Sequence, residues 1–332
     1  MKKKYQNAFF LFGIAVFAVM LTNLNLHEVL AGISRAGYWF FAVVLLWVFL
    51  YALNTTAWYL IIKSQIQHGR SNKSHVPFLW LYKITVSGFA LNYATPGGLM
   101  GGEPYRIMEL APRIGTERAS SSVILYAMTH IFSHFWFWML SALLYVITQP
   151  LSLGMSLLLA LIVAFCSLAV WFFLSGYKKG LAVRGMNLLS HFPWAGKWAR
   201  RFIDNHRERL QTIDNQIAAL HGQNPRVFLA VVMLELLCRV CSAFEIYFVL
   251  LVLYTHVSFV NSILILAFTS LFANMLFFMP LQLGGREGGF YMSVTKLGMT
   301  PSAAVFVALI VRLRELVWTG IGLLLIKVTK RK

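Results

Sequence analysis

The sequence contains few charged residues and very few cysteines, and each shortage excludes a class of protein. Only 12% of the 332 residues are charged, whereas 59% are hydrophobic, and this balance lies outside the range of soluble globular domains. The three cysteines, Cys166, Cys238 and Cys241, all lie in apolar runs, so a disulfide framework is not expected. The C-x-x-C spacing of Cys238 and Cys241 has no other ligand residue nearby, and we interpret both as packing residues.

The sequence also lacks the short motifs of common enzymes. It has no G-x-S-x-G, H-E-x-x-H, Walker loop or kinase signature, and each of these would mark a specific chemistry. His130 and His134 share a helix face at i, i+4, but no third ligand accompanies them, so we expect no metal site. We therefore predict a protein that is not an enzyme and needs no cofactor.

Long apolar runs are abundant, and several reach the 18 residues that a membrane-spanning helix requires. They fall at 8–26, 38–62, 76–93, 122–147, 151–175, 226–254, 259–280 and 302–327. The polar interval 177–225 places Phe202, Leu210 and Ile217 at helical spacing beneath a charged face, which indicates an amphipathic helix on the cytoplasmic membrane surface. We predict an all-α, polytopic membrane helix bundle that forms one integral membrane domain over residues 1–332.

The positive charges predict how this bundle is oriented. In a soluble protein a formal net charge of +18 would suggest a nucleic-acid partner, but in a membrane protein the distribution of Lys and Arg reports topology. If the basic loops face the cytoplasm, they hold 22 of the 29 Lys and Arg, and the connections 27–37, 148–151 and 255–258 carry only Arg35. The positive-inside rule then predicts a multi-pass protein of the cytoplasmic (inner) membrane with both termini in the cytoplasm.

Two glycine-rich segments interrupt the apolar pattern, "NYATPGGLMGGEPYR" at 92–106 and "MPLQLGGREGG" at 279–289. The charge count places both ends of 76–118 on the cytoplasmic side and both ends of 259–300 outside, so each is predicted to form a re-entrant hairpin. In both tips a proline precedes a glutamate by seven residues with a glycine pair between them, at an offset of 184 residues. We therefore predict two inverted half-repeats, 1–147 and 151–327, as in many transporters.

The two tips are the predicted functional site. Backbone that is not helical at membrane depth must be buried in protein or line a hydrated cavity, and glycine-rich turns followed by helix N-termini suit an anion such as a phosphate. The candidate substrate-binding residues are Asn92, Thr95, Pro96, Gly97, Gly98, Gly101, Gly102, Glu103, Arg106, Pro280, Gly284, Gly285, Arg286, Glu287, Arg312 and Arg314. The alternative is that each arginine and glutamate form a buried structural pair that secures the turn.

Further charges lie within the predicted spans. Glu235 and Arg239 have the i, i+4 spacing and order that favour an intrahelical pair. Glu245 has no local partner in the sequence, so we expect it to pair with an arginine on another helix, with a protonatable role as the alternative.

At "TPGGLMGGEPYR", "MPLQLGGREGG" and the closing "VRLRELVWTGIGLLL" the sequence resembles the lysylphosphatidylglycerol synthase transmembrane family, whose membrane domain is flippase-like. The resemblance covers nearly the whole chain and implies movement of a lipid between leaflets. In two-part members a separate cytoplasmic domain makes the aminoacylated lipid. Here the chain stops at Lys332, so aminoacyl transfer is not expected. The second tip departs from the family pattern in its Leu281-Gln282-Leu283 stretch and in the order Arg286-Glu287, which leaves the lipid open.

The sequence thus predicts a lipid translocase that handles an anionic, phosphate-bearing head group. Its partners would be the membrane and a phospholipid or isoprenoid-linked lipid, and no nucleic acid. Two alternatives stay open: an integral membrane enzyme of lipid or cell-envelope assembly, and a non-transporting partner of a separate lipid-modifying or glycosyl transferase.

The predicted topology can be tested by labelling single cysteines in a background without the three native ones. Cysteines placed at Arg70 and Gln223 should react only from the cytoplasmic side, and Pro150→Cys only from outside, because the basic loops must stay inside. Labelling of Pro150→Cys from the cytoplasm would refute both the topology and the inverted repeat.

Overall fold

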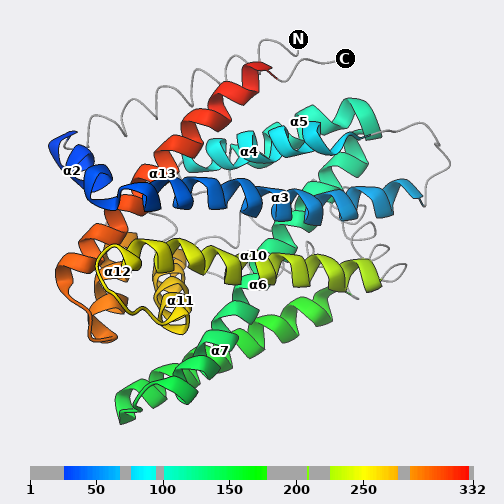
Figure 1. Cartoon of the computed structure of the whole chain (residues 1–332). Helices are drawn as coiled ribbons and strands as arrows, with labels where there is room; N and C mark the ends of the chain where they lie inside the picture. The colour runs from blue at the N-terminus through cyan, green and yellow to red at the C-terminus, as the bar shows by residue number, and fades with distance from the viewer. Residues whose placement is uncertain are drawn as a thin grey trace, which may run out of the picture.

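The computed structural model describes residues 26–67, 76–94, 101–177, 208, 225–275 and 285–328. In these ranges the chain forms ten α-helices and no strand, which confirms the predicted all-α bundle. They are α2 (Leu26–Ala36), α3 (Tyr38–Gln67), α4 (Phe78–Ala94), α5 (Gly102–Ile114), α6 (Thr116–Thr148), α7 (Leu153–Tyr177), α10 (Pro225–Leu251), α11 (Phe259–Met275), α12 (Gly285–Lys296) and α13 (Pro301–Val328) (Figure 1). The predicted segments 8–26 and 177–225 lie almost entirely outside the described residues.

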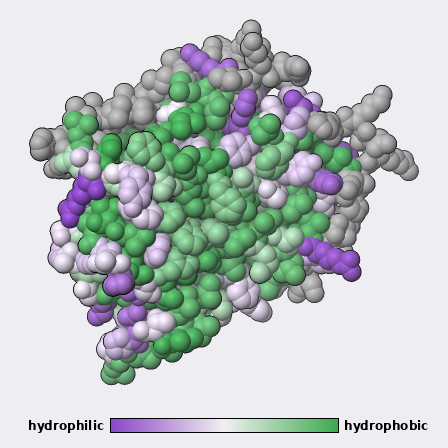
Figure 2. Space-filling model, in the orientation of Figure 1, coloured by the Kyte–Doolittle hydropathy of each residue, from purple (hydrophilic) through white to green (hydrophobic). Residues whose placement is uncertain are grey.

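Four helices, α3, α6, α7 and α10, are long and apolar enough to cross a membrane. Hydrophobic residues cover most of the face in Figure 2, and hydrophilic residues lie mainly toward its edges. On α7 the exposed side chains include Leu157, Leu161, Leu168 and Trp171, which a water-soluble protein would bury. Because a helix that is apolar all round is stable in lipid, this surface shows a membrane protein.

The two segments predicted as hairpins are pairs of shorter helices. Helix α4 ends at Ala94 and α5 begins at Gly102, and α11 ends at Met275 before α12 begins at Gly285. Helix α5 runs antiparallel to α4, since the Gly102 N–H contacts Asn92 whereas Arg106, further along α5, contacts Thr85. Helices α11 and α12 also pack on each other. The helix is therefore broken in both predicted places.

Small residues let the helices approach closely. A Cβ atom on Gly102 would lie 2.2 Å from the carbonyl oxygen of Gly88, and one on Gly289 would lie 3.1 Å from Cα of Thr269. Between α4 and α13, a Cβ on Gly322 would lie 2.5 Å from Cβ of Ala90, and the Ser87 hydroxyl donates to the Gly322 carbonyl at 2.9 Å. Membrane helices, which gain little from the hydrophobic effect, associate through such close contacts.

The packing of the helices has the pairing that a two-fold repeat would give. When α3, α4, α5 and α6 are exchanged with α10, α11, α12 and α13, the main contacts map onto one another. Thus α3 packs on α4 as α10 packs on α11, α5 on α6 as α12 on α13, and α4 on α13 as α11 on α6. The opposite orientation of the halves across the membrane stays a prediction, which the labelling experiment tests.

Two individual residues fit the same pairing. Gly115, between α5 and α6, has φ +90°, and Gly298, between α12 and α13, has φ +79°, so both turns need a residue without a Cβ atom. Helices α3 and α10 lie side by side (Figure 1), and the Asn54 side chain donates to Sγ of Cys238 at 3.3 Å. Asn54 and Cys238 are 184 positions apart, which is also the offset between the two tips. Two residues at equivalent positions of a two-fold repeat contact each other where they lie on the axis.

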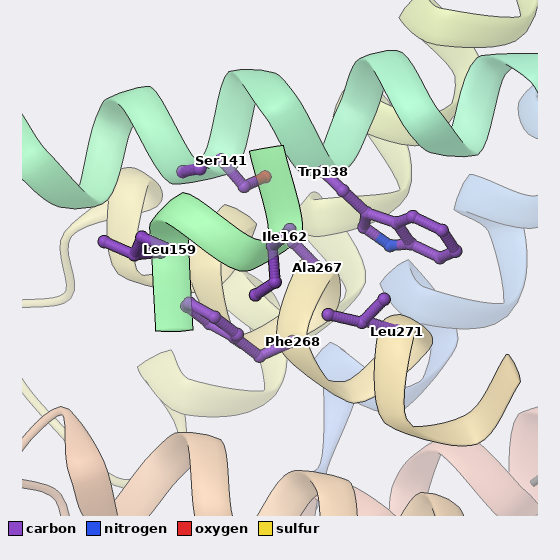
Figure 3. Close-up of a pocket in the computed structure, with 8 residues that line it drawn as sticks. Trp138, Ser141, Leu159, Ile162, Ala267, Phe268 and Leu271 are labelled. Carbon is purple, nitrogen blue, oxygen red and sulfur yellow. The ribbon is translucent and has the colours of Figure 1, made fainter. Parts of the chain in front are cut away.

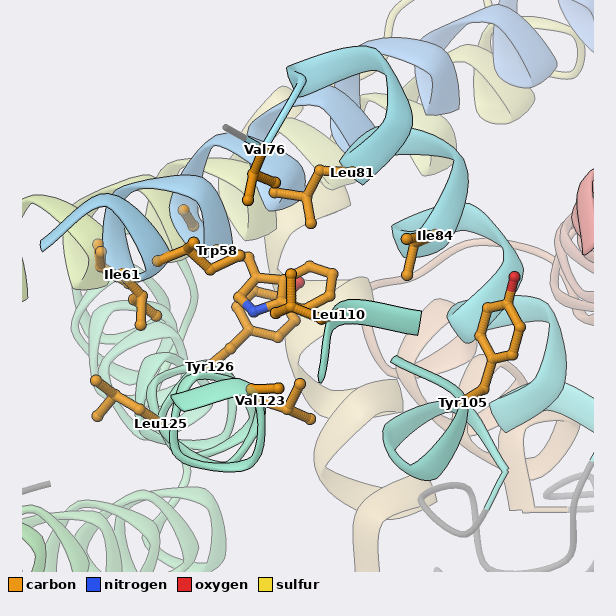
Figure 4. Close-up of a cluster of buried hydrophobic side chains, with 14 of the residues drawn as sticks. Trp58, Ile61, Val76, Leu81, Ile84, Tyr105, Leu110, Val123, Leu125 and Tyr126 are labelled. Atoms are coloured by element: carbon orange, nitrogen blue, oxygen red, sulfur yellow. The ribbon is translucent and has the colours of Figure 1, made fainter. Parts of the chain in front are cut away.

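The largest buried cluster holds the first hairpin in place. Trp58 of α3 and Tyr126 of α6 lie together, with Leu110 of α5 beside them (Figure 4), and all three side chains are at most 1% exposed. Interdigitated side chains of this kind allow little movement without loss of contacts. In this conformation the cluster therefore packs α5 against α3 and α6.

Replacing Gly102 by alanine should lower the unfolding temperature in detergent by several degrees, because the new Cβ would meet the α4 backbone, which cannot rotate away. Gly154→Ala in α7 is the matched control, since nothing lies within 4 Å of its Cβ position. That change should stabilise slightly, by up to about 1 kcal/mol. Equal unfolding temperatures for the two variants would refute close packing at Gly102.

Candidate functional site

Asn92 organises the described part of the first tip. Its side-chain N–H donates to Oε1 of Glu103 at 2.9 Å, and its side-chain oxygen, Oδ1, accepts a hydrogen bond from the backbone N–H of Gly102 at 2.7 Å. The first N–H groups of a helix lack partners within the helix and can bind an anion. Here Asn92 takes the N–H of Gly102 in place of a ligand and joins the end of α4 to the start of α5.

Arg106 lies in the interior of the first hairpin, with its side chain only 2% exposed. Its guanidinium carbon lies 4.6 Å from the ring centre of Phe89 and 5.4 Å from that of Tyr126, at distances that favour cation–π attraction. A guanidinium nitrogen lies 3.6 Å from Oε1 of Glu103, and another donates to the Thr85 carbonyl at 3.4 Å. In this conformation Arg106 holds α5 against α4 and α6, and a ligand would reach it only if the hairpin opened.

Gly88 makes room for this arginine. A Cβ atom at Gly88 would lie 2.4 Å from Nε of Arg106. Arg106 of the first tip can therefore lie here only because position 88, outside the tip, is a glycine.

The second hairpin meets the first at Tyr93, the residue after Asn92. The Tyr93 hydroxyl donates to Glu315 of α13, and Arg286 of α12 donates both to Glu315 and to the Tyr93 oxygen. Three helices, α4, α12 and α13, are therefore joined at one carboxylate. Because Asn92 contacts the first tip and Tyr93 contacts the second, the end of α4 links the two hairpins.

The other two arginines of the site also contact carboxylates. Nε and Nη2 of Arg312 lie 2.9 and 2.8 Å from Oε1 of Glu287, and its Nη1 lies 3.5 Å from Oε2 of Glu315. Arg314 binds both oxygens of Glu245, at 2.7 and 2.9 Å. The prediction that Glu245 pairs with an arginine on another helix is confirmed.

The Arg314–Glu245 pair is further enclosed by Trp47. The guanidinium of Arg314 lies 3.8 Å from the ring centre of Trp47, whose indole N–H donates to Glu245 at 3.0 Å. Both charged side chains are 3% exposed, and a two-point guanidinium–carboxylate contact is the strongest geometry for such a pair.

The second hairpin and its partners thus form a charge-balanced network of three arginines and three glutamates. We call Arg286, Arg312, Arg314, Glu245, Glu287 and Glu315 the tip network. Exposure rises from one end of it to the other, from 3% for the side chains of Arg314 and Glu245 to 26% for Arg286 and 39% for Glu287. A charge at membrane depth must be paired or hydrated, and only the Arg286–Glu287 end of the tip network is open to a ligand.

Some of the remaining predicted site residues lie in the described part of the chain, and the others lie outside it. Gly101 precedes the first turn of α5, and Gly285 is buried at the start of α12. Thr95, Pro96, Gly97, Gly98, Pro280 and Gly284 lie outside the described residues.

A second polar cluster lies between α6 and α10, where sequence reasoning expected an intrahelical pair. Nδ1 of His130 lies 2.7 Å from Oε2 of Glu235. Arg239 donates to the Ser133 hydroxyl and to the His130 carbonyl, both at 2.6 Å. Glu235 and Arg239 therefore make their hydrogen bonds across to α6 instead of to each other. In the described part of the chain no group of three His, Cys, Asp or Glu side chains could hold a metal ion.

Two apolar hollows border α6 and α7, away from the tip network. One is a groove of about 740 Å³ lined by residues such as Trp136, Leu143 and Val163. The other, about 10 Å³, lies between α6, α7 and α11, with Trp138 and Phe268 on its walls (Figure 3). Their linings suit hydrocarbon and offer almost no polar group to a head group.

Comparison with known proteins identifies a matching family. The family model described as "Lysylphosphatidylglycerol synthase TM region" matches residues 8–322. Neither the curated proteins nor the solved structures contain a significant match.

Two glutamate substitutions should separate the closed end of the tip network from its open end. Glu245→Gln leaves Arg314 buried without its two-point partner and should cost about 3–5 kcal/mol of unfolding free energy. Glu287→Gln, at the exposed end, should cost about 1 kcal/mol or less. Thermal unfolding in one detergent measures both, and Arg314→Met combined with Glu245→Leu should recover most of the loss. Equal losses for the two glutamate variants would contradict the exposure gradient.

Proposed function

The chain belongs to the lysylphosphatidylglycerol synthase transmembrane family, and from that premise we propose that it moves a lipid with an anionic, phosphate-bearing head group between the leaflets of the cytoplasmic membrane. The observation that carries the proposal is the open end of the tip network. There Arg286, 26% exposed, contacts Glu315 and Tyr93 at the meeting point of the two hairpins. Its guanidinium can bind a phosphate by the same two-point geometry that binds a carboxylate.

If Arg286 exchanged the carboxylate of Glu315 for a phosphate, every buried charge would still have a partner of opposite charge. If a lipid phosphate takes the place of Glu315 on Arg286, the carboxylate of Glu315 still has Nη1 of Arg312 at 3.5 Å and Nη2 of Arg314 at 3.8 Å. An unpaired buried carboxylate would cost several kcal/mol. The tip network therefore supports a site where an anion and Glu315 compete for one arginine at low cost.

This exchange would also alter how the hairpins are held together. The contact of Arg286 with Tyr93 and Glu315 joins α12 to α4 and α13. A phosphate bound to Arg286 would weaken that junction, and the hairpins could then part on the side from which the lipid entered. Alternating access in transporters with broken helices uses such movements of one repeat against the other.

The test is lipid movement in proteoliposomes with fluorescent phosphatidylglycerol, which is anionic, and, separately, with zwitterionic fluorescent phosphatidylcholine, in which a choline cation offsets the phosphate. Wild-type protein should move phosphatidylglycerol faster. Arg286→Gln should slow that movement by about tenfold or more, the effect of losing one charge-assisted hydrogen bond. Arg286→Lys should restore little of the rate, because a point charge replaces a planar fork.

Arg113→Gln is the matched control, since Arg113 lies in α5 with its guanidinium 4.1 Å from the ring centre of Trp80, outside the tip network. It should keep the wild-type preference for the anionic lipid. The unfolding temperature of Arg286→Gln should stay close to that of wild type, because Glu315 keeps two arginines nearby. If Arg286→Gln lost lipid movement and thermal stability together, Arg286 would have a structural role. If the protein converted the fluorescent lipid to a different lipid, it would be an enzyme and not a translocase.

A further inference from the structure

We propose that His130 and Glu235 form a proton-binding site in the bundle interior, and that proton uptake there drives the lipid movement proposed above. The proposal rests on that function but not on its binding site, because the pair lies on α6 and α10 and shares no residue with the tip network. The proposed site binds a proton, and its binding atoms are the imidazole nitrogens of His130 and the carboxylate oxygens of Glu235.

The contact geometry fits a pair that shares one proton and can take another. At 2.7 Å between Nδ1 of His130 and Oε2 of Glu235, one proton lies between the two groups, since a carboxylate without a proton can only accept. The second ring nitrogen, Nε2, then has a lone pair for an incoming proton. Histidine is the side chain whose charge changes most readily near neutral pH.

Accessibility gives the two groups different roles. The carboxylate of Glu235 is 1% exposed, whereas the side chain of His130 is 32% exposed. Among the described residues, Oε1 of Glu235 has no hydrogen-bond partner, and an unsatisfied buried oxygen is costly. A proton arriving at Nε2 of His130 would place a positive ring beside this carboxylate.

The surrounding charges set the balance of the site. On α10, Arg239 donates to the Ser133 hydroxyl and to the His130 carbonyl, both of which are neutral groups. Cys238, also on α10, contacts α3, where its Sγ accepts a hydrogen bond from Asn54. On α6, the rings of Tyr126 and His134 lie 6.1 and 5.8 Å from that of His130. Helix α5 contributes Arg106, whose guanidinium carbon lies 5.4 Å from the ring centre of Tyr126. With neutral imidazoles, the charges of Arg239 and Glu235 cancel, and a proton on His130 adds one positive charge.

That added charge would act on the first hairpin. The ring of His130 lies 6.1 Å from those of Phe89 and Tyr126, and the same two rings enclose the guanidinium of Arg106. A charged His130 would repel Arg106 across these rings, where little water screens the interaction. Proton uptake would thus favour movement of α5 away from α6, whereas proton loss would favour the closed hairpin.

Proton binding can be measured without any lipid by ¹⁵N nuclear magnetic resonance of histidine-labelled protein in nanodiscs. The His130 signals, assigned by their loss in His130→Gln, should change from neutral to charged shifts as the pH is lowered from 9 to 4, and in the neutral form should report hydrogen on Nδ1. Glu235→Gln should yield a mixture of the two neutral tautomers, because the carboxylate that selects Nδ1–H is gone. His134→Gln, one turn away, should leave the His130 signals in place. Signals constant across this pH range would overturn the proposal.

Coupling is tested by the final distribution of fluorescent phosphatidylglycerol in proteoliposomes with a gradient of one pH unit. If one proton moves with each lipid, the wild-type protein should produce an approximately tenfold unequal distribution between leaflets, since one pH unit is a tenfold ratio of proton activity. His130→Gln should still move lipid but leave it evenly distributed, and His134→Gln should resemble wild type. Even distribution with the wild-type protein would refute proton coupling while the proposed function stood, and no movement at all would refute the proposed function itself.

Discussion

The second hairpin, the end of α4 and α13 meet at one enclosed carboxylate, that of Glu315, on which three arginines converge. Its side chain is fully buried, and Arg286, Arg312 and Arg314 all lie within 4 Å of it. A carboxylate at this depth is tolerable only while it is paired. Since Arg286 belongs to α12 and Tyr93, which donates to the same carboxylate, belongs to α4, the pairing of Glu315 joins the two broken helices to each other and to α13.

Such convergence is possible only because the helix backbones approach closely. Gly322 lets α13 lie against Val86 and Ala90 of α4, and Gly102 lets α5 lie against Gly88. At an ordinary interhelical distance the short side chain of Asn92 would not reach Glu103 and the backbone N–H of Gly102. We inferred from the sequence that tip glycines admit a ligand, but at Gly102 the close neighbour is the protein's own backbone. Close packing and charge pairing therefore support each other.

The all-α fold and the helix breaks could be predicted from the sequence, because long apolar runs report helices and proline and glycine report their interruptions, whereas the topology inferred from Lys and Arg stays a prediction. The two helix interruptions follow from Pro96, Pro280 and the glycines beside them, and the partner of Glu245 was expected to be an arginine of another helix. Which arginine it would be could not be predicted, since Arg312 and Arg314 lie two residues apart and only the rotation of α13 selects between them.

Other parts of the site depend on tertiary contacts that have no sequence signal. Tyr93 was missed because a tyrosine beside a predicted tip looks like any aromatic residue of a membrane helix. Arg106 was expected to face a cleft, but aromatic side chains from α4 and α6 enclose it. Their convergence follows from packing between helices far apart in the sequence. His130 was noticed for its spacing from His134, whereas its contact is with Glu235, 105 residues away.

The two halves carry different residues at one position that the proposed repeat would make equivalent. At the offsets of 182 to 184 residues that align the start of α6 with that of α13, His130 corresponds to the stretch from Arg312 to Arg314. On α13 this position carries permanent charges, and Arg314 binds Glu245 of α10 at two points. On α6 it carries an imidazole, which contacts Glu235 of the same helix α10. A repeat with permanent pairs in both halves would have no group whose charge could change near neutral pH. With a histidine at this position in one half only, protonation would act on α5 of the first half, whereas the arginines at the corresponding position of α13 would keep their charge.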